Sequence, residues 1–498
     1  MKNKKSQIWN SQTGNQNLEQ NVLFCAGRDV QRLPMSDEVL IRYDIWTNRA
    51  HCIMLQKQGL ISKSNLRKIL DGLSQLEKLV TSGKFSLDPN KEDVHMNVEA
   101  FVTENKGIEA GGRMHIGRSR NDQSACDMRL YLRSVGIDLF QSVKKLAHTL
   151  LNQAEKHSES VMPGFTHHQP AMITTWGHWL CSYVQGLCRD LERISFAISQ
   201  INRNPLGSAA AFGTTWPIDR ELTTKLMAFE KIDENTLDCI VSRWENEAQL
   251  AHAGTMLMIR LSIVSQDLIF LSHPYSNLIQ IEDSFLTGSS IMPQKRNPDF
   301  AEIIKSKASL AQGFLSSLLN IQKSNLSGYN RDTQATKYLI MDLIRECESV
   351  PIILKNVFES LVINTKEMEK KCDRDFMYSV DLADHLSKNL NLPFRECYHI
   401  LAKAVKLSHN ETKISSSIMK NVLKELGLSS EISKNLEHLQ NPKKTIEKRT
   451  HIGSPSPKQT LIQIDSLSKM LTSLSKPIKN LEKKIIEAEN NCKSFKII

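Results

Sequence analysis

Residues 288–299 read GSSIMPQKRNPD, a polar stretch that begins on glycine and leads into a helical pattern. After it, apolar side chains return at intervals of three, four and seven residues, as on one face of an α-helix. We expect Asn297 to cap this helix and Pro298 to lie in its first turn, where a missing N–H is tolerated. Two serines, a lysine and an asparagine would then lie beside a helix N-terminus, which favours negative charge. Such a loop can bind a carboxylate and stabilise the charge formed when the neighbouring carbon loses a proton.

Long windows without proline carry the same helical periodicity in much of the chain. No proline occurs between Pro89 and Pro163, between Pro170 and Pro205, between Pro217 and Pro274, or from Asp299 to Val350. We expect one helix to begin after Ser62 and another to open at Val94. Strand-like alternation is scarce, so the sequence predicts an all-α protein of long helices packed side by side.

Composition narrows the class of protein and its partners. A chain of 498 residues is long enough for two or three domains or one elongated helical core. The net charge of +10 comes from dispersed basic residues without zinc-finger spacing or an aromatic-basic motif, so we expect local anion binding and no nucleic acid. The ten cysteines include no CxxC pair, which is typical of a reduced protein. We found no signal peptide and no apolar run of membrane length, and therefore expect a cytoplasmic protein without a membrane partner.

A second polar stretch, residues 111–123, reads GGRMHIGRSRNDQ. Its glycines would let the backbone approach a ligand, and its arginines and asparagine offer directional donors. A solvated basic turn is the other interpretation of these residues. Further polar stretches are MPGFTHHQ at 162–169, PLGS at 205–208, WPIDRE at 216–221, YNRDTQATK at 329–337, DLA at 381–383 and LPFR at 392–395.

Taken together, these stretches resemble a known family. The stretch at 288–298 is similar to the consensus G-S-S-x-M-P-x-K-x-N-P of the fumarase/aspartase superfamily, and HIGRSRNDQ is similar to a block of the argininosuccinate lyases. The other stretches match the same family in order, over about residues 35–460. The resemblance implies a three-domain fold with a central long-helix bundle, assembled into a homotetramer, and no cofactor or metal. Its expected divisions are an N-terminal domain at 1–118, a bundle at 119–370 with a catalytic loop at 283–299, and a small C-terminal domain at 371–498.

The resemblance also implies a reaction, the β-elimination of argininosuccinate to L-arginine and fumarate in arginine biosynthesis. By resemblance Ser289 is the base that removes a proton next to a carboxylate, ionised by loop amides and the helix N-terminus. Lys295 and Asn297 would stabilise the doubly charged aci-carboxylate that results. His167 has a suitable intrinsic pKa for the general acid that protonates the leaving nitrogen, and Glu302 could orient it.

Six further residues fall where the family holds the carboxylates and amino group of its substrate. They are Arg120, Asn121, Thr166, Tyr329, Gln334 and Lys337. Without the resemblance, residues 329–337 could equally be a polar loop between helices. These residues are far apart in the chain, and in the family they meet only where three subunits join.

The sequence departs from the family pattern in places that bear on the substrate. Leu33 stands where a substrate-contacting serine is expected, Pro170 replaces an arginine, and Trp244 lies in a segment that is usually Ser-Asp-Arg-Asp. Two alternatives therefore stay open: a related carbon–nitrogen lyase for another N-substituted aspartate, and a non-catalytic structural homologue. The intact loop and His167 argue against the second. The absence of HExxH and of a GxxxxGK[ST] loop argues against a metalloenzyme and a nucleotide-dependent ligase.

Overall fold

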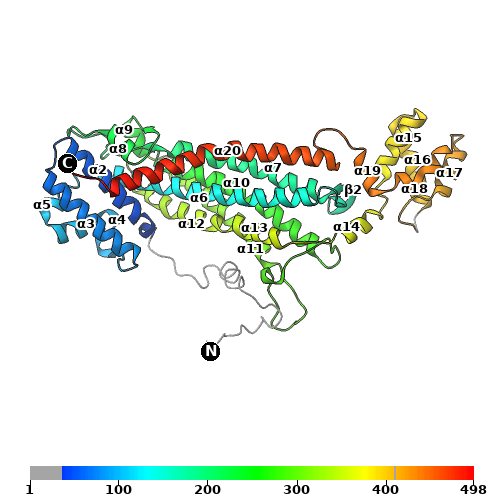
Figure 1. Cartoon of the computed structure of the whole chain (residues 1–498), viewed down its shortest axis with the longest axis horizontal. Coiled ribbons are helices and arrows are strands. Elements are labelled where there is room, and N and C mark those ends of the chain that lie inside the picture. The colour runs from blue at the N-terminus through cyan, green and yellow to red at the C-terminus, as the bar shows by residue number, and fades with distance from the viewer. Residues whose placement is uncertain (1–35, 409–410, 498) are drawn as a thin grey trace.

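The structure, a computed structural model, describes residues 36–408 and 411–497 (Figure 1). Within these ranges it is built almost wholly of helices, and its strands form only three two-stranded sheets. The prediction of an all-α fold is therefore confirmed.

The N-terminal unit is a set of helices at one end of the molecule (Figure 1). It comprises η2 (Ser36–Leu40), α2 (Ile41–Lys57), α3 (Lys63–Thr81), η3 (Pro89–Lys91), α4 (Val94–Lys106) and α5 (Ile108–Gly111). Both helix starts predicted here are confirmed. The Ser62 hydroxyl accepts the Asn65 N–H at 3.1 Å to cap α3, and the Asp93 carboxylate accepts the Met96 N–H at 2.8 Å to cap α4.

Long helices lie side by side along the middle of the molecule (Figure 1). They are α6 (Arg120–Lys156), α7 (Trp176–Ile201), α10 (Arg243–Ser272), α11 (Asp299–Ile321), α12 (Gln334–Glu348) and α13 (Val350–Ser360). Short elements connect them: β3 (Arg203–Asn204), α8 (Arg220–Leu226), β4 (Lys231–Ile232), α9 (Thr236–Val241), β5 (Ile279–Gln280), η4 (Asp283–Phe285), η5 (Arg331–Thr333) and β6 (Val362–Ile363). One continuous apolar core runs through the bundle and into the N-terminal unit. The nine cysteines within the described ranges are all free and buried, as expected of reduced core residues.

A smaller unit with a separate core follows the bundle. Its elements are α14 (Thr365–Cys372), α15 (Ser379–Leu390), α16 (Phe394–Leu407), α17 (Ser416–Glu425), η6 (Glu431–Asn435), α18 (Leu436–Leu439) and α19 (Pro442–Glu447). The last helix, α20 (Pro457–Lys493), leaves this unit and packs along α6 and α7, where Leu467, Leu471 and Ile478 join the bundle core. The domain limits at 118 and 370 stay predictions. We propose from the packing that the third unit ends near residue 447 and that α20 belongs to the bundle.

Helix α10 is long and apolar enough to cross a membrane by length and composition alone, although half of its most apolar window is buried within this chain. It packs against α7, α11 and α12, so it occupies the place of a core helix. Part of its apolar surface nevertheless remains exposed, including Ile259 and Ile263. A core helix left partly uncovered indicates that something else packs on this face.

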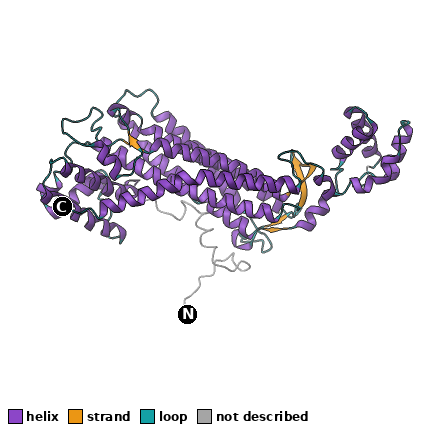
Figure 2. Ribbon diagram, turned by 45° about the horizontal axis from the view of Figure 1, so that its top comes forward, coloured by secondary structure: helices purple, strands orange, loops and turns teal. Residues whose placement is uncertain are grey.

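A two-stranded hairpin, which we call the histidine hairpin (residues 161–175), joins α6 to α7. Its strands β1 (Val161–Thr166) and β2 (Gln169–Thr175) lie beside the small C-terminal unit (Figure 2). Behind the hairpin, the start of α7 lies directly against the end of α6. The Gly177 N–H donates to the His157 carbonyl at 3.0 Å, and a Cβ at Gly177 would lie 2.6 Å from the Ala154 oxygen. Only glycine permits this approach of the two helices.

We predict that Gly177→Ala destabilises the protein, because the added methyl would meet backbone atoms that cannot rotate away. The expected loss is about 2 kcal/mol, in the range of overpacked cores. It would be measured as a lower midpoint of thermal unfolding, with Ser64→Ala on the exposed face of α3 as control. An unchanged midpoint in Gly177→Ala would contradict the close approach.

Candidate functional site

The polar stretch singled out in the sequence forms an exposed loop, residues 288–296, which we call the serine loop. Its two ends are held together by an antiparallel bridge. The Thr287 N–H donates to the Asn297 carbonyl at 3.0 Å, and the Asn297 N–H donates to the Thr287 carbonyl at 2.9 Å. The Asn297 side chain adds a bond from its amide to the Gly288 carbonyl at 3.2 Å.

The prediction that Asn297 caps α11 is wrong. The bridge to Thr287 engages the Asn297 backbone, so the helix begins only at Asp299, with Pro298 in the cap position and no side-chain cap. Asp299 instead accepts the Thr287 hydroxyl at 2.9 Å. Asn297 therefore closes the loop.

Ser289 lies at the start of the serine loop and is half-buried. Its hydroxyl oxygen accepts two backbone N–H groups, from Ile291 at 3.3 Å and from Met292 at 3.1 Å. Two donors directed at one oxygen stabilise negative charge on that oxygen more than they stabilise the neutral hydroxyl. This geometry favours ionisation of Ser289.

Two other predicted residues of this region are exposed. Lys295 has no ion-pair or hydrogen-bond partner for its ammonium group within the part of the chain that the structure describes. The loop's other cation, Arg296, is by contrast paired with Asp283. Glu302 lies on the first turn of α11, also exposed and without a hydrogen-bond or ion-pair partner among the described residues. Both charged groups are free to meet a ligand.

His167 lies at the tip of the histidine hairpin, where Thr166 pairs with Gln169 across a two-residue turn. His167 and His168 have φ angles of 52° and 61°, so both central residues are left-handed. Such a turn normally takes Asn or Gly, and side chains with a Cβ are strained there. His167 is exposed, whereas the His168 ring contacts Phe270 edge to face at 6.4 Å. Thr166 lines a cavity of about 560 Å³ between the hairpin, α7 and α10.

Most of the remaining predicted residues gather at the opposite end of the bundle. Arg120, Arg331 and Lys337, which we call the cation cluster, each hold a carboxylate there. Arg120 donates to Glu92 at 3.2 Å and to Asp93 at 3.0 Å, Arg331 donates to Glu92 at 3.2 Å, and Lys337 donates to Asp37 at 2.5 Å. Gln334 accepts from Arg331 at 3.1 Å, and the Tyr329 ring lies 5.6 Å from the Arg243 guanidinium. A pocket of about 560 Å³ opens among these side chains.

Arg120 and Asn121 open α6, and their neighbours in the motif hold this segment in place. Asp122 completes a capping box with the N-cap residue Ser119 by accepting the Ser119 N–H at 2.9 Å, and its other oxygen accepts the N–H groups of Gly207 and Ala209, both at 2.8 Å. The PLGS stretch is thereby tied to the same helix end. Asn121 is half-buried beside Arg120.

Beneath this segment lies a buried polar network. The Asp44 carboxylate accepts from Gln123 at 2.7 Å and contacts His95 at 2.8 Å, while Asp127 accepts the Thr47 hydroxyl at 2.6 Å. Burial and the adjacent Asp44 raise the pKa of Asp127 well above its usual value, which favours the protonated form of Asp127. Burial alone would raise the pKa of Asp44 too, but hydrogen bonding and the charge of His95 lower it, which favours the ionised form of Asp44. The network supports the start of α6 from beneath.

The glycines of residues 111–123 serve packing within the chain. Gly117 has φ of 72°, and a Cβ there would lie 2.9 Å from the Ile218 side chain. At Gly111 a Cβ would collide with Thr103. The expectation that these glycines admit a ligand is therefore wrong for these two, because protein atoms already occupy the space.

The structure brings Arg120, Asn121, Tyr329, Gln334 and Lys337 to one end of the bundle. It does not bring them to His167, because α6 separates them: its 37 residues extend about 55 Å, with Arg120 at one end and the hairpin beyond the other. Figure 1 shows α4 and α5 at one end of the bundle and β2 at the other. Within the described ranges, no hydrogen bond or ion pair joins the serine loop to the hairpin either. One chain thus keeps these predicted residues in three separate places.

Glu247, which the sequence did not single out, is a buried acid beside the cation cluster. It lies on α10, is 2% exposed, and one of its carboxylate oxygens has no hydrogen-bond partner among the described residues. Burial raises the pKa of Glu247 to about 7, although Thr336, Arg243 and Lys337 lower it. No sequence signal marks Glu247, since it occurs at an ordinary position of an apolar helix and its charge matters only once it is buried.

The positions at which the sequence departs from the expected pattern have different settings. Pro170 is exposed in β2 opposite Phe165, and Trp244 is half-buried in the first turn of α10, next to Arg243. Leu33 lies outside the described residues. Of the two described positions, Trp244 is the one at the same end of the bundle as the cation cluster, next to Arg243, whose guanidinium lies over the ring of Tyr329.

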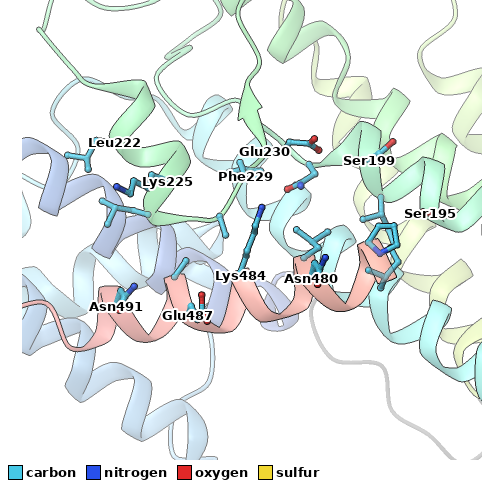
Figure 3. Close-up of a pocket in the computed structure, with 18 residues that line it drawn as sticks. Ser195, Ser199, Leu222, Lys225, Phe229, Glu230, Asn480, Lys484, Glu487 and Asn491 are labelled. Carbon is cyan, nitrogen blue, oxygen red and sulfur yellow. The ribbon is translucent and has the colours of Figure 1, made fainter. Parts of the chain in front are cut away.

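A different cavity, of about 810 Å³, opens between α7, α8 and the second half of α20 (Figure 3). Its lining includes the apolar side chains of Leu222, Phe229 and Leu481, and Asn480 and Lys484 line it from α20. None of the predicted site residues lines it. Size alone therefore does not identify the functional site in this chain.

The chain matches two family profiles, one described as "Lyase" over residues 28–313 and one described as "Argininosuccinate lyase C-terminal" over residues 376–447. It is 37% identical over 423 residues to the argininosuccinate lyase of Azotobacter vinelandii, covering 85% of this chain and 90% of that one. It is 36% identical over 428 residues to the argininosuccinate lyase of Neisseria gonorrhoeae, covering 86% and 92%. Among solved structures, the crystal structure of EDDS lyase in complex with formate has a TM-score of 0.84 at 24% identity, covering 95% and 94%. That likeness shows the fold.

The raised pKa of Glu247 predicts a pH-dependent stability. A carboxyl whose pKa rises from 4.5 to about 7 on folding stabilises the folded state fully below pH 4.5, and this contribution is lost as the pH rises through 7. The difference corresponds to roughly 3 kcal/mol. Glu247→Gln, which stays neutral, should melt at an increasingly higher temperature than the natural protein between pH 5.5 and pH 8.5. Glu104→Gln is the exposed control, and parallel melting curves for Glu247→Gln across this range would contradict the assignment.

Proposed function

The chain belongs to the argininosuccinate lyase family, and we propose that its serine loop, histidine hairpin and cation cluster together split argininosuccinate into arginine and fumarate. The activity is that of a carbon–nitrogen lyase that releases fumarate, a step of arginine biosynthesis. The observation that carries the assignment of residues is the pair of N–H groups on the Ser289 oxygen.

In this proposal Ser289 is the base. Its alkoxide, stabilised by the Ile291 and Met292 amides, removes a proton from the carbon next to a carboxylate of the succinyl half. The electrons left on that carbon move into the carboxylate, which becomes a doubly charged aci-carboxylate. The loop amides and the nearby N-terminus of α11 favour negative charge at this place.

Lys295 and Asn297 stabilise the aci-carboxylate. Lys295 suits this role because its ammonium group is exposed and, among described residues, unpaired, so no internal carboxylate has to be displaced. Asn297 has its backbone fixed by the bridge to Thr287, which limits the movement of its side chain. Donors that are fixed before the reaction stabilise developing charge without a cost of reorganisation.

His167 is the proposed general acid. When the aci-carboxylate collapses, the C–N bond breaks, fumarate forms, and the departing guanidino nitrogen takes a proton from His167. The left-handed turn supports this role, because strained backbone persists where the surrounding structure imposes it and often marks a functional site. Glu302 is the proposed partner that orients His167, and it is exposed and free to do so.

The cation cluster and its neighbours hold the rest of the substrate. Arg120 and Lys337 offer charge to carboxylates, while Asn121, Tyr329 and Gln334 offer uncharged hydrogen-bonding groups to carboxylate and amino groups. Thr166 would contribute from the hairpin. Polar groups that converge on one pocket are typical of sites that fix the orientation of a small ligand.

The serine loop, the histidine hairpin and the cation cluster lie apart within one chain. A complete site would therefore require several copies of the chain. We propose that these copies form a homotetramer in which each site takes its parts from different subunits. Exposed apolar side chains on the bundle helices support the proposal, among them Ile263 on α10 at 57% exposure and Leu319 on α11 at 50%. Burying such residues would stabilise an interface. We also propose that the enzyme is cytoplasmic.

We predict that Ser289→Ala abolishes turnover while leaving folding and assembly intact, because the Ser289 side chain is on an exposed loop and supports no core. With argininosuccinate as substrate, kcat should fall by at least about a thousandfold. The measurement is fumarate release, followed by its ultraviolet absorbance, together with the mass of the assembled protein. Near-normal turnover by Ser289→Ala would remove this serine from the mechanism.

We predict that two inactive variants restore activity when mixed. Ser289→Ala and His167→Asn should each be inactive, but mixed tetramers would contain sites that take an intact serine from one subunit and an intact histidine from another. If the serine and the histidine of a site come from different subunits, random assembly of equal amounts of the two variants leaves both residues intact in roughly a quarter of the sites. The variants would be unfolded, mixed and refolded, with each variant refolded alone as control. If no activity returns in well-formed mixed tetramers, each site takes both residues from one chain.

A further inference from the structure

Glu92 stands out because its backbone is strained. It lies between η3 and α4 with φ of 63° and ψ of −52°, values that a residue with a Cβ rarely adopts. The Asp93 N–H donates to the Lys91 carbonyl at 2.6 Å, so the hydrogen bond spans a single residue. Glu92 is thus the centre of a γ-turn of the strained kind, which is rare in proteins.

The Glu92 side chain bridges two members of the cation cluster. One carboxylate oxygen accepts from Arg120 at 3.2 Å and the other from Arg331 at 3.2 Å. Arg120 lowers the pKa of Glu92, and Glu92 in turn raises the pKa of Arg120. The carboxylate is about half exposed, at the edge of the pocket that Gln334 and Lys337 also line.

The pocket has three other carboxylates, Asp37, Asp93 and Asp332. Among the described residues Asp332 forms no ion pair with the cation cluster, and the other two have structural roles that Glu92 lacks. Asp93 caps α4 through the Met96 N–H, and Asp37 accepts the Val94 N–H at 3.0 Å. If either carboxylate moved, the N-terminus of α4 would lose a hydrogen-bond acceptor for one of its N–H groups. Glu92 accepts hydrogen bonds only from the two arginines among the described residues, so its carboxylate can leave without disturbing a helix.

We propose that Glu92 is an internal counter-ion that occupies the place of a substrate carboxylate on Arg120 and is displaced when the substrate binds. The inference rests on the proposed function, in which Arg120 binds a carboxylate of argininosuccinate. In the empty site, a carboxylate of the protein neutralises the charge of Arg120, the charge that would otherwise bind the substrate carboxylate. The carboxylate best suited to leave is the exposed one held on a strained turn.

Displacement has a consequence for affinity. The substrate must break the bonds from Glu92 to Arg120 and Arg331 before it can use Arg120, so Glu92 weakens binding. Release of the Glu92 carboxylate also allows the strained γ-turn to relax, which partly offsets the weakening of substrate binding. Glu92 would therefore set how tightly dicarboxylates bind without taking part in the chemical step.

The test is the affinity of Glu92→Gln for ligands that carry carboxylates. Removing an exposed ion pair of this kind should change the dissociation constant of a competing ligand by about two- to fivefold. We expect the KM for argininosuccinate and the Kd for succinate, measured by calorimetry, to fall together by about this factor. Glu109→Gln is the matched control, since Glu109 forms a similar exposed pair with Arg113 outside the pocket. It should change neither constant.

A second variant separates displacement from the general effect of removing a negative charge. Glu92→Asp keeps the charge but is one methylene shorter, so it cannot bridge both guanidinium groups in the same way. If Glu92 acts as a displaceable counter-ion, this variant should also bind succinate more tightly. A Kd that falls in Glu92→Gln but not in Glu92→Asp would show a long-range charge effect and overturn the proposal.

Unchanged or weaker succinate binding by Glu92→Gln would also overturn it, because Glu92 would then be neutral or would help to position Arg120. These outcomes are distinct from failure of the proposed function. That failure would appear as no fumarate release by the natural protein, and the calorimetric comparison with succinate would still decide the role of Glu92.

Discussion

The length of one rigid helix constrains everything else in this molecule. Helix α6 has 37 residues without a proline and carries Arg120 at its first position and the histidine hairpin beyond its last. A straight helix of about 55 Å cannot bring its two ends together. In the proposed homotetramer, other copies of the chain would cover the exposed serine loop, the exposed His167 and the uncovered apolar side chains of α10 and α11.

The motifs contain two kinds of polar residue, which burial and partners distinguish. In residues 115–123, Asp122 and Gln123 are buried with their hydrogen bonds made inside the protein, and they hold the helix end and the PLGS stretch in place. Arg120, on the same helix turn, is exposed and pairs with Glu92 and Asp93, which line the pocket. A polar residue whose partners all come from the protein supports the site, whereas an exposed one beside it is available to a ligand.

The sequence predicted the helical fold because apolar periodicity and capping residues are local signals, as at Ser62 and Asp93. Through the family resemblance it also named five of the residues near the cation cluster, but it expected them to meet only where subunits join and did not predict that they gather within one chain. It failed for the Asn297 cap, where a long-range bridge to Thr287 overrode a local preference. Glu247 and Glu92 could not be found, because burial of an acid and a strained turn arise only in the folded chain.

The strain at His167 requires support, and the small C-terminal unit supplies it. A two-stranded hairpin is only marginally stable in isolation, so its shape must be fixed by packing. At the base of the hairpin, Val161 and Ile173 belong to the core of the C-terminal unit. Arg449 donates to the Ile173 carbonyl at 2.6 Å and, through three further bonds of 3.2, 2.9 and 2.7 Å, to the Asp381 carboxylate. The same side chain thus ties the C-terminal unit to the strand that leads to the tip. Because the base is held in this way, the left-handed turn at the tip can persist with two histidines where asparagine and glycine would be more stable.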